Sequence, residues 1–201
     1  MEAVAYYPVI ENHTEIPCLD TINYDYKWDA GKFIEEAKAM KEDALMLKEQ
    51  MGKDFKPFVY ELTFNQTYSF CGCLSFTNHK YINRGGVHPS NVMESRSYCI
   101  NSETEMSLSD IINEKVLDVS LVEYVARLFV DKFNVIAPES ADVYTYDYVK
   151  EYLGYVWFYL DEKSLVLYFN QGEIAPYALG VISVEIPYEA ELFDIDMSCN
   201  M

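Results

Sequence analysis

Two consecutive runs of alternating apolar and polar residues, between positions 58 and 76, constrain the fold more than any other feature of the chain. The alternating residues are Phe58, Tyr60, Leu62 and Phe64 in the first run and Tyr68, Phe70, Gly72, Leu74 and Phe76 in the second. Successive side chains of a strand point to opposite faces of the sheet, so each run predicts a strand with one buried face. The polar segment Asn65-Gln66-Thr67 between them predicts a hairpin turn.

A helix is predicted immediately before this hairpin. Its apolar residues recur at spacings of four, three, four, three and four, which gives one apolar stripe on a helix. They are Phe33, Ala37, Met40, Ala44, Leu47 and Met51. Gly52 is expected to end the helix. Before it, we expect a short strand at residues 4–10 and a turn-rich stretch through Pro17 and Asn23.

The second half of the chain predicts further helices and strands. Capping patterns at Ser107–Asp110 and Ser120–Glu123 predict two helix starts, and Pro138 is expected to end the second helix. A short turn or helix is expected at residues 147–153, then a hairpin of strands 155–160 and 165–169, and a strand at residues 181–186.

Helices and strands therefore alternate without the regular rhythm of a parallel sheet, which favours an α+β fold with antiparallel sheets and packed helices. Ser95–Ile100 is predicted to return beside the first hairpin after a sharp reversal at residues 84–89. A boundary is expected in the polar segment 101–106. We therefore predict two α+β domains, at residues 1–103 and 104–201.

Charge narrows the classes of partner. The 201 residues include 33 acidic and 15 basic ones, a net charge of −18. This excess repels phosphates, so we expect no nucleic acid partner, whereas a basic protein is favoured. From Glu139 onward there are 12 acidic and two basic residues, which form either a solvated face or a docking surface for a cationic partner. The tail after Tyr188 is expected to be acidic and loose.

Membrane and targeting signals are not predicted. No stretch approaches the roughly 20 apolar residues that a membrane span needs. The first residues lack a basic stretch followed by an apolar core, so neither a signal peptide nor an anchor is expected in the chain as written.

The cysteines argue against a metal site. There are five of them, an odd number, which disfavours a complete disulfide framework. Cys71 and Cys73 are expected on one face of a strand and, with Cys99, His79 and His88, have the chemistry of zinc ligands. The C-x-C spacing is not that of a usual zinc knuckle, so we expect thiols, no metal and no cofactor.

The Gly85-Gly86-Val87-His88 segment has two interpretations. His88 has the chemistry of an acid or base near neutral pH, and Gly85 and Gly86 would let a ligand approach the backbone. The alternative, which we favour, is a histidine that hydrogen-bonds across a tight turn. No nucleophile elbow, zinc-protease motif or phosphate-binding loop is present in the sequence, and no catalytic residue is predicted.

Three residues near the C-terminus are candidate binding residues. Tyr168 and Tyr177 offer rigid rings with polar tips, which suit protein or glycan surfaces. Pro176 is expected to fix the turn that presents Tyr177. The alternative is that these side chains pack in the core beneath the hairpin.

Two segments resemble known bacterial domains. The run from Val156 to Tyr188, with its Glu-Ile-Ala-Pro-Tyr-Ala turn and Val-Glu-Ile-Pro-Tyr close, resembles the end of the RsiV-like domain family. The segments 7–10, 85–89 and 108–111 resemble the domain that usually precedes it, also found in front of the peptidoglycan deacetylase PdaC. The resemblance spans about residues 6–188. The chain departs from the family at Cys99, where relatives usually have Asp, and at Val87, where they have Ala.

The resemblance implies an extracytoplasmic, non-catalytic recognition module that binds lysozyme, a similar basic wall hydrolase, or peptidoglycan. The sigma-binding segment and the deacetylase domain of these relatives have no counterpart here. One alternative is a peptidoglycan-modifying enzyme, or its accessory domain, that uses His88 and a carboxylate. Another is a cytoplasmic relative with an unknown partner, which is expected if Met1 is the true start.

Overall fold

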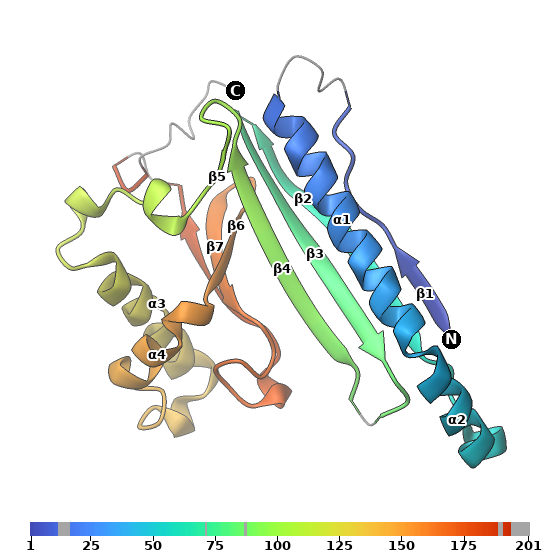
Figure 1. Cartoon of the computed structure of the whole chain (residues 1–201). Coiled ribbons are helices and arrows are strands. Elements are labelled where there is room, and N and C mark those ends of the chain that lie inside the picture. Colours follow the sequence, from blue (N-terminus) through green and yellow to red (C-terminus); the bar gives the residue numbers. More distant parts are fainter. Residues whose placement is uncertain (12–16, 71, 87, 189–190, 194–201) are drawn as a thin grey trace. The chain divides into compact units, whose positions relative to one another are not determined.

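The computed structural model confirms the α+β class (Figure 1) and describes residues 1–11, 17–70, 72–86, 88–188 and 191–193. A five-stranded sheet has the order β1-β2-β3-β4-β5, and a three-stranded sheet has the order β6-β7-β8. The strands are β1 (Glu2–Ala5), β2 (Val59–Phe70), β3 (Cys73–Asn83), β4 (Ser90–Cys99), β5 (Thr104–Glu105), β6 (Trp157–Leu160), β7 (Ser164–Phe169) and β8 (Ile182–Pro187). The α-helices are α1 (Pro17–Ala39), α2 (Lys41–Met51), α3 (Leu121–Ile136) and α4 (Tyr146–Tyr152).

The chain forms two compact units that do not coincide with the predicted division after residue 103. Unit 1 comprises Met1–Gln66 and Thr77–Glu94, and unit 2 comprises Thr67–Phe76 and Ser95–Met201. Each of the long strands β2, β3 and β4 contributes residues to both units. One cut in the sequence therefore cannot separate them.

Unit 1 places α1 along strands β1 and β2 (Figure 1). Strand β1 pairs in parallel with β2, with Glu2 opposite Val59. Phe33 of α1 packs edge-on against Tyr60 of β2, with 6.0 Å between ring centroids. The buried core residues of this unit are Ala30, Phe33, Ala37, Ala44, Phe58, Tyr60 and Leu62.

Three local predictions for this half of the chain were wrong in position. The stretch through Pro17 and Asn23 is helical, because the buried stripe of α1 already begins at Leu19 and Ile22. The single helix predicted to Met51 is two helices, which meet at Met40. The hairpin turn does not lie at residues 65–67, because β2 runs on to Phe70.

Two glycines occupy positions with positive φ at the ends of elements. Gly52 caps α2 with a φ of 56°, as expected, whereas Gly72, which was expected within a strand, lies in the β2–β3 turn with a φ of 72°. Both values fall in the left-handed region that side chains disfavour. Hydrogen bonding also anchors the second turn, because Ile100 N donates to Gly72 O at 2.7 Å.

Unit 2 packs α3 and α4 beside the sheet β6-β7-β8, whose strands are all antiparallel. Ser120 caps α3 as predicted, and its side chain accepts a hydrogen bond from Glu123 N. On α3, Val125, Phe129 and Phe133 are buried, whereas Val122 is exposed. The predicted helix after Ser107 is only one turn of 3-10 helix, Leu108–Asp110.

Every residue of β7 is buried. Phe169 at its end meets Phe129 edge-on, with 4.7 Å between ring centroids. Strand β7 lies between β6 and β8, and its residues Leu165, Leu167 and Phe169 belong to the unit 2 core. It is therefore the central strand of the unit 2 core.

Serine hydroxyls satisfy the outer edge of β6. Ser75 Oγ accepts a hydrogen bond from Leu160 N at 3.1 Å, and Ser95 Oγ donates to Phe158 O at 2.6 Å. These two backbone groups point away from β7, because Phe158 and Leu160 alternate with the residues that bond to it. We call Ser75, Ser95 and Ser97 the serine seam; Ser75 and Ser97 hydroxyls lie 2.8 Å apart.

In the described part of the chain, no helix has the length and apolar character needed to cross a bilayer.

Candidate functional site

The best candidate for a binding surface is the loop of residues 170–181, between β7 and β8. Four consecutive residues of this loop, Pro176 to Leu179, are exposed. Pro176, Ala178 and Leu179 are apolar, and Tyr177 is aromatic. Tyr177 is 41 % exposed, Leu179 36 % and, further along, Val181 46 %. We call this surface the 170–181 loop.

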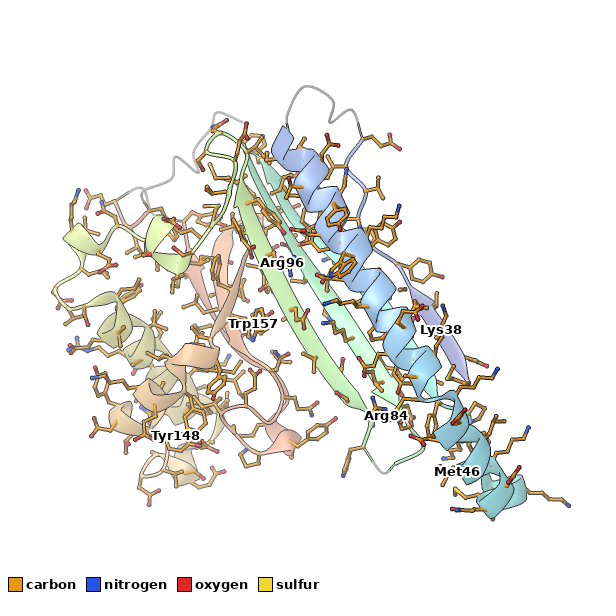
Figure 2. The ribbon with its side chains drawn as sticks, in the orientation of Figure 1. Lys38, Met46, Arg84, Arg96, Tyr148 and Trp157 are labelled. Atoms are coloured by element: carbon orange, nitrogen blue, oxygen red, sulfur yellow. The ribbon has the colours of Figure 1, made fainter. Side chains whose placement is uncertain are left out.

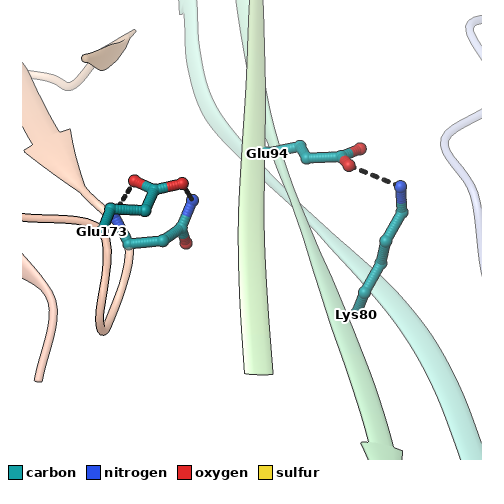
Figure 3. Close-up of polar contacts among 4 residues, drawn as sticks. Lys80, Glu94 and Glu173 are labelled. Atoms are coloured by element: carbon teal, nitrogen blue, oxygen red, sulfur yellow. Dashed lines mark hydrogen bonds and ion pairs between the residues drawn. The ribbon is translucent and has the colours of Figure 1, made fainter. Parts of the chain in front are cut away.

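The start of the loop is held by a carboxylate. Glu173 accepts hydrogen bonds from the backbone N of Asn170 at 2.5 Å and from its Nδ2 at 3.4 Å (Figure 3). Gly172 between them has a φ of 84°, which allows the chain to turn this tightly. Asn170 is itself buried, so the turn is anchored at the end of the central strand.

The exposed part of the loop is held at two further points. Gln171 Nε2 donates to Tyr177 O at 2.6 Å. The hydroxyl of Tyr148, on α4 (Figure 2), donates to Ile174 O at 2.9 Å. The side chain of Ile174 is buried in the unit 2 core. The Tyr177 backbone is thus fixed while its ring remains accessible.

Tyr148 belongs to an aromatic column that links the loop to α3. Its ring contacts those of Tyr144 and Tyr152, and Tyr144 stacks on Phe133 with 4.0 Å between centroids. Burial, the hydrogen bond with Tyr152 and the nearby charges raise the pKa of Tyr148 to about 12. The hydroxyl therefore keeps its proton at neutral pH and stays a donor to the loop.

The sequence-predicted binding residues fall into three settings. Pro176 and Tyr177 are exposed together on the 170–181 loop of unit 2. Gly85, Gly86 and His88 are exposed together on the β3–β4 turn of unit 1. The remaining candidate, Tyr168, belongs to neither surface.

Tyr168 requires a correction. It is fully buried in β7, and its hydroxyl donates to Ser95 Oγ at 3.1 Å. A side chain in this position packs in the core and cannot contact a partner, so we no longer count it among the binding residues.

The β3–β4 turn is anchored by the residue before its glycines. Arg84 donates from Nε to the Tyr60 hydroxyl at 2.6 Å and pairs with Glu36 of α1 at 2.9 Å (Figure 2). Gly85 has a φ of 79°, and its N donates to Asn83 Oδ1. Sequence analysis did not single out Arg84, because its partners lie 24 and 48 residues away.

Cys73, Cys99, His79 and His88 have the chemistry of zinc ligands, but they are not grouped as a metal site in the part of the chain that the structure describes. No three His, Cys, Asp or Glu residues there are grouped so that they would hold a metal ion. Cys71 lies outside the described residues. Cys73 is buried, and Cys18 and Cys99 are half-buried.

The fold and the loop thus define a two-unit α+β protein with an ordered, exposed apolar loop between its last two strands. Two family models match parts of this chain. Residues 1–91 match "Deacetylase PdaC", and residues 126–189 match "Protein of unknown function (DUF3298)". The β3–β4 turn lies in the first matched segment and the 170–181 loop in the second.

Solved structures support the fold. A DUF3298 family protein from Pseudomonas aeruginosa PAO1 matches 75 % of this chain and 69 % of its own, with 17 % identity and a TM-score of 0.50. A member of the same family from Bacteroides fragilis matches 87 % of this chain and 69 % of its own, with the same identity and TM-score. At this identity the likeness concerns the fold alone. We found no match among curated proteins.

Proposed function

We propose that this protein is a non-catalytic recognition module of the bacterial cell envelope, and that the 170–181 loop binds a basic wall hydrolase of the lysozyme type. The match of residues 1–91 to a model named for a deacetylase supports a role at the cell wall. The 170–181 loop lies within residues 126–189, the segment that matches the DUF3298 family model. An extracytoplasmic location follows from the same proposal.

The observation that carries the proposal is the ordered exposure of Tyr177. Aromatic residues contribute strongly to binding when little conformational freedom is lost on association. The Tyr177 backbone is held by Gln171 and the turn by Glu173. Leu179 and Val181 add exposed apolar surface beside it in sequence.

Charge favours a basic partner for the same unit. Unit 2 contains 19 acidic and six basic residues, a formal charge of −13, whereas unit 1 contains 14 and nine, a formal charge of −5. Long-range attraction accelerates the association of oppositely charged proteins and weakens as salt is added. The acidic unit is therefore the one that also presents the loop.

Calorimetric titration with a panel of lysozymes tests the proposal. A basic protein that is not a lysozyme serves as the control, and each titration is repeated at a higher salt concentration. We expect saturable binding that distinguishes lysozymes from the control and survives added salt in part. Equal binding of the control, abolished by salt, would reduce the interaction to bulk charge attraction and contradict the proposal.

A pair of matched variants locates the contact. Tyr177→Ala should weaken binding by about 2 kcal/mol, roughly thirtyfold, as expected for a central aromatic residue. Tyr6→Ala removes an exposed tyrosine from unit 1 and should leave the affinity unchanged. Equal effects of the two substitutions would remove the loop from the interface.

Peptidoglycan is the second ligand of the proposal, since the same aromatic surface suits glycans. Titration with soluble wall fragments tests peptidoglycan binding. Binding of fragments without binding of lysozyme would identify peptidoglycan as the ligand of the loop. The same fragments test the absence of catalysis. If the protein turned over these fragments and the His88→Ala variant did not, the protein would be a wall-modifying enzyme and not a non-catalytic recognition module.

A further inference from the structure

Two hydrogen bonds fix the register of β3 against β4 in unit 2. Ile100 N donates to Gly72 O at 2.7 Å, and the hydroxyls of Ser75 and Ser97 lie 2.8 Å apart. Residue numbers fall along one strand as they rise along the other, so the two strands are antiparallel here. Counting inward from both contacts places Cys73 directly opposite Cys99.

The two cysteines also share a face of the sheet. Side chains two residues apart in a strand point to the same face of the sheet. The Cys73 side chain therefore points to the same face as Ser75, and the Cys99 side chain to the same face as Ser97. The Ser75 and Ser97 side chains meet on one face. The Cys73 and Cys99 side chains therefore lie side by side on that face.

The spacing of this pair suits a disulfide. The bond from Ile100 to Gly72 marks positions 72 and 100 as a hydrogen-bonded pair, so the next pair, Cys73 and Cys99, is a non-hydrogen-bonded one. Such pairs have Cα atoms about 4.5 Å apart. Disulfides span Cα separations of about 4.4–6.8 Å, so the bond can form without moving the strands apart, near the short end of the range.

The two thiols have different reactivities. Burial raises the pKa of Cys99, but hydrogen bonds from Ser102 and from the backbone of Ser102 and Asn101 outweigh it and lower the pKa below its ordinary value. Cys99 is also partly accessible. Burial and the neighbouring Cys99 raise the pKa of Cys73 to about 11. Cys99 is thus the attacking thiol, and Cys73 is the second, resolving one.

We infer that Cys73 and Cys99 are a covalent modification site, which a disulfide oxidant such as glutathione disulfide or an oxidised thiol–disulfide oxidoreductase converts into a cross-strand disulfide. This site is independent of the 170–181 loop. It joins β3 to β4 inside unit 2, next to the serine seam.

The reaction balances without any other reagent. The Cys99 thiolate attacks one sulfur of the oxidant, forms a mixed disulfide and releases the first oxidant thiolate. Cys73 then loses its proton and attacks Cys99 Sγ, which releases the second thiolate. The two cysteines lose two electrons and two protons in all, and the oxidant leaves as two thiols.

Thiol trapping in the full chain tests the inference. Folded protein is equilibrated with glutathione disulfide, free thiols are alkylated, and tryptic peptides are identified by mass spectrometry. Trypsin cuts after Lys80 and Arg96, so Cys73 and Cys99 fall in different peptides. A Cys71→Ser background leaves Cys73 as the only cysteine of its peptide. We expect both thiols to be lost from alkylation and the two peptides to be recovered as one linked species.

Cys73→Ala in the same background is the matched control, and Cys99 should then stop at a stable mixed disulfide with glutathione. Three results in the folded Cys71→Ser protein would overturn the inference. They are full alkylation of both thiols, a stable mixed disulfide on Cys99 without linkage to Cys73, or linkage of Cys99 to Cys18 or Cys199. Circular dichroism before trapping establishes that each variant is folded.

Discussion

Replacing Ser75 by alanine tests the serine seam. Ser75 is fully buried, and its hydroxyl contacts Ser97 Oγ and accepts the hydrogen bond from Leu160 N. Leu160 is the last residue of β6 and is also fully buried. Without the hydroxyl, this N–H points into the protein interior with its acceptor removed.

The expected loss follows from the two hydrogen bonds. A buried donor without a partner costs about 1–3 kcal/mol, and losing the bond to Ser97 adds about 1 kcal/mol. Ser75→Ala should therefore lower the free energy of unfolding of unit 2 by about 2–4 kcal/mol. With a urea dependence of about 2 kcal/mol per molar, the midpoint should fall by about 1–2 M.

Tryptophan fluorescence measures this loss in the correct unit. The chain has two tryptophans, Trp28 in unit 1 and Trp157 in unit 2. A Trp28→Phe background leaves Trp157 as the reporter of unit 2. Ser69→Ala, at an exposed position of β2, is the matched control and should change the free energy of unfolding by under about 0.5 kcal/mol.

Ser75→Thr keeps the hydroxyl and should recover part of the stability. A midpoint for Ser75→Ala equal to that of Ser69→Ala would refute the reasoning, because it would mean that the buried hydroxyl contributes nothing to the β6 edge.

Two further predictions concern the same part of the chain. Gly72→Ala should destabilise unit 2 by about 1–2 kcal/mol, because the φ of Gly72 is 72° and an added Cβ would lie 2.9 Å from Asn101 Nδ2. Urea titration measures the loss. Gly86→Ala is the control, because a Cβ added there meets nothing within 4 Å. Stability should fall as the pH rises from 9.0 towards about 11, because burial and Cys99 raise the pKa of Cys73 over that interval. The unfolded chain then releases a proton that the folded chain retains. Cys73→Ala should flatten this decline, and an unchanged slope would contradict it.

The elements that could be predicted are those with complete local signals. Helix α3 has a capping serine, a regular apolar stripe and a following proline, and the structure confirms it from Leu121 to Ile136. The hairpin of β6 and β7 and the strand β8 are marked by short apolar runs with polar residues between them, and they lie where expected. The short helix α4, Tyr146–Tyr152, lies close to the turn or helix expected at residues 147–153.

The errors have two different origins. Pro17 and Asn23 suggested a turn at the start of α1, although the buried residues Leu19, Ile22 and Tyr26 continue the apolar stripe at helical spacing, so a signal for this part of the helix was present in the sequence. Strand β2 continues past the turn-like residues 65–67, because the chain instead reverses at Gly72. Local propensity is a weak guide wherever tertiary packing opposes it.

The residues of the candidate site also divide into those that the sequence could predict and those that it could not. Pro176 and Tyr177 follow a strand and are exposed, as a turn proline predicts. Tyr168 was misjudged, although the unbroken apolar run of β7 is itself typical of a strand buried on both faces. Tyr148 supports the loop from 26 residues away, and nothing in the local sequence marks that contact.

The interleaved units make a last prediction about fragments. A fragment 104–201, which follows the division predicted from sequence, lacks Ser75 and Ser95 and therefore leaves Leu160 N and Phe158 O of β6 without their partners. It also lacks Tyr68, whose ring packs edge-on against Tyr188. A fragment 67–201 keeps all of these contacts, because it contains the whole of unit 2.

We expect fragment 67–201 to unfold cooperatively in urea, with Trp157 fluorescence as the readout, and fragment 104–201 to show no cooperative transition. Ser75→Ala within fragment 67–201 should again lower the midpoint, which ties the result to the serine seam rather than to chain length. A cooperative transition of fragment 104–201 at the midpoint of the longer fragment would show that residues 67–103 contribute no stability to unit 2. In that case the division after residue 103 would describe the energetics better than the compact units do, since buried donors and acceptors at the β6 edge would have to be satisfied from within the shorter fragment.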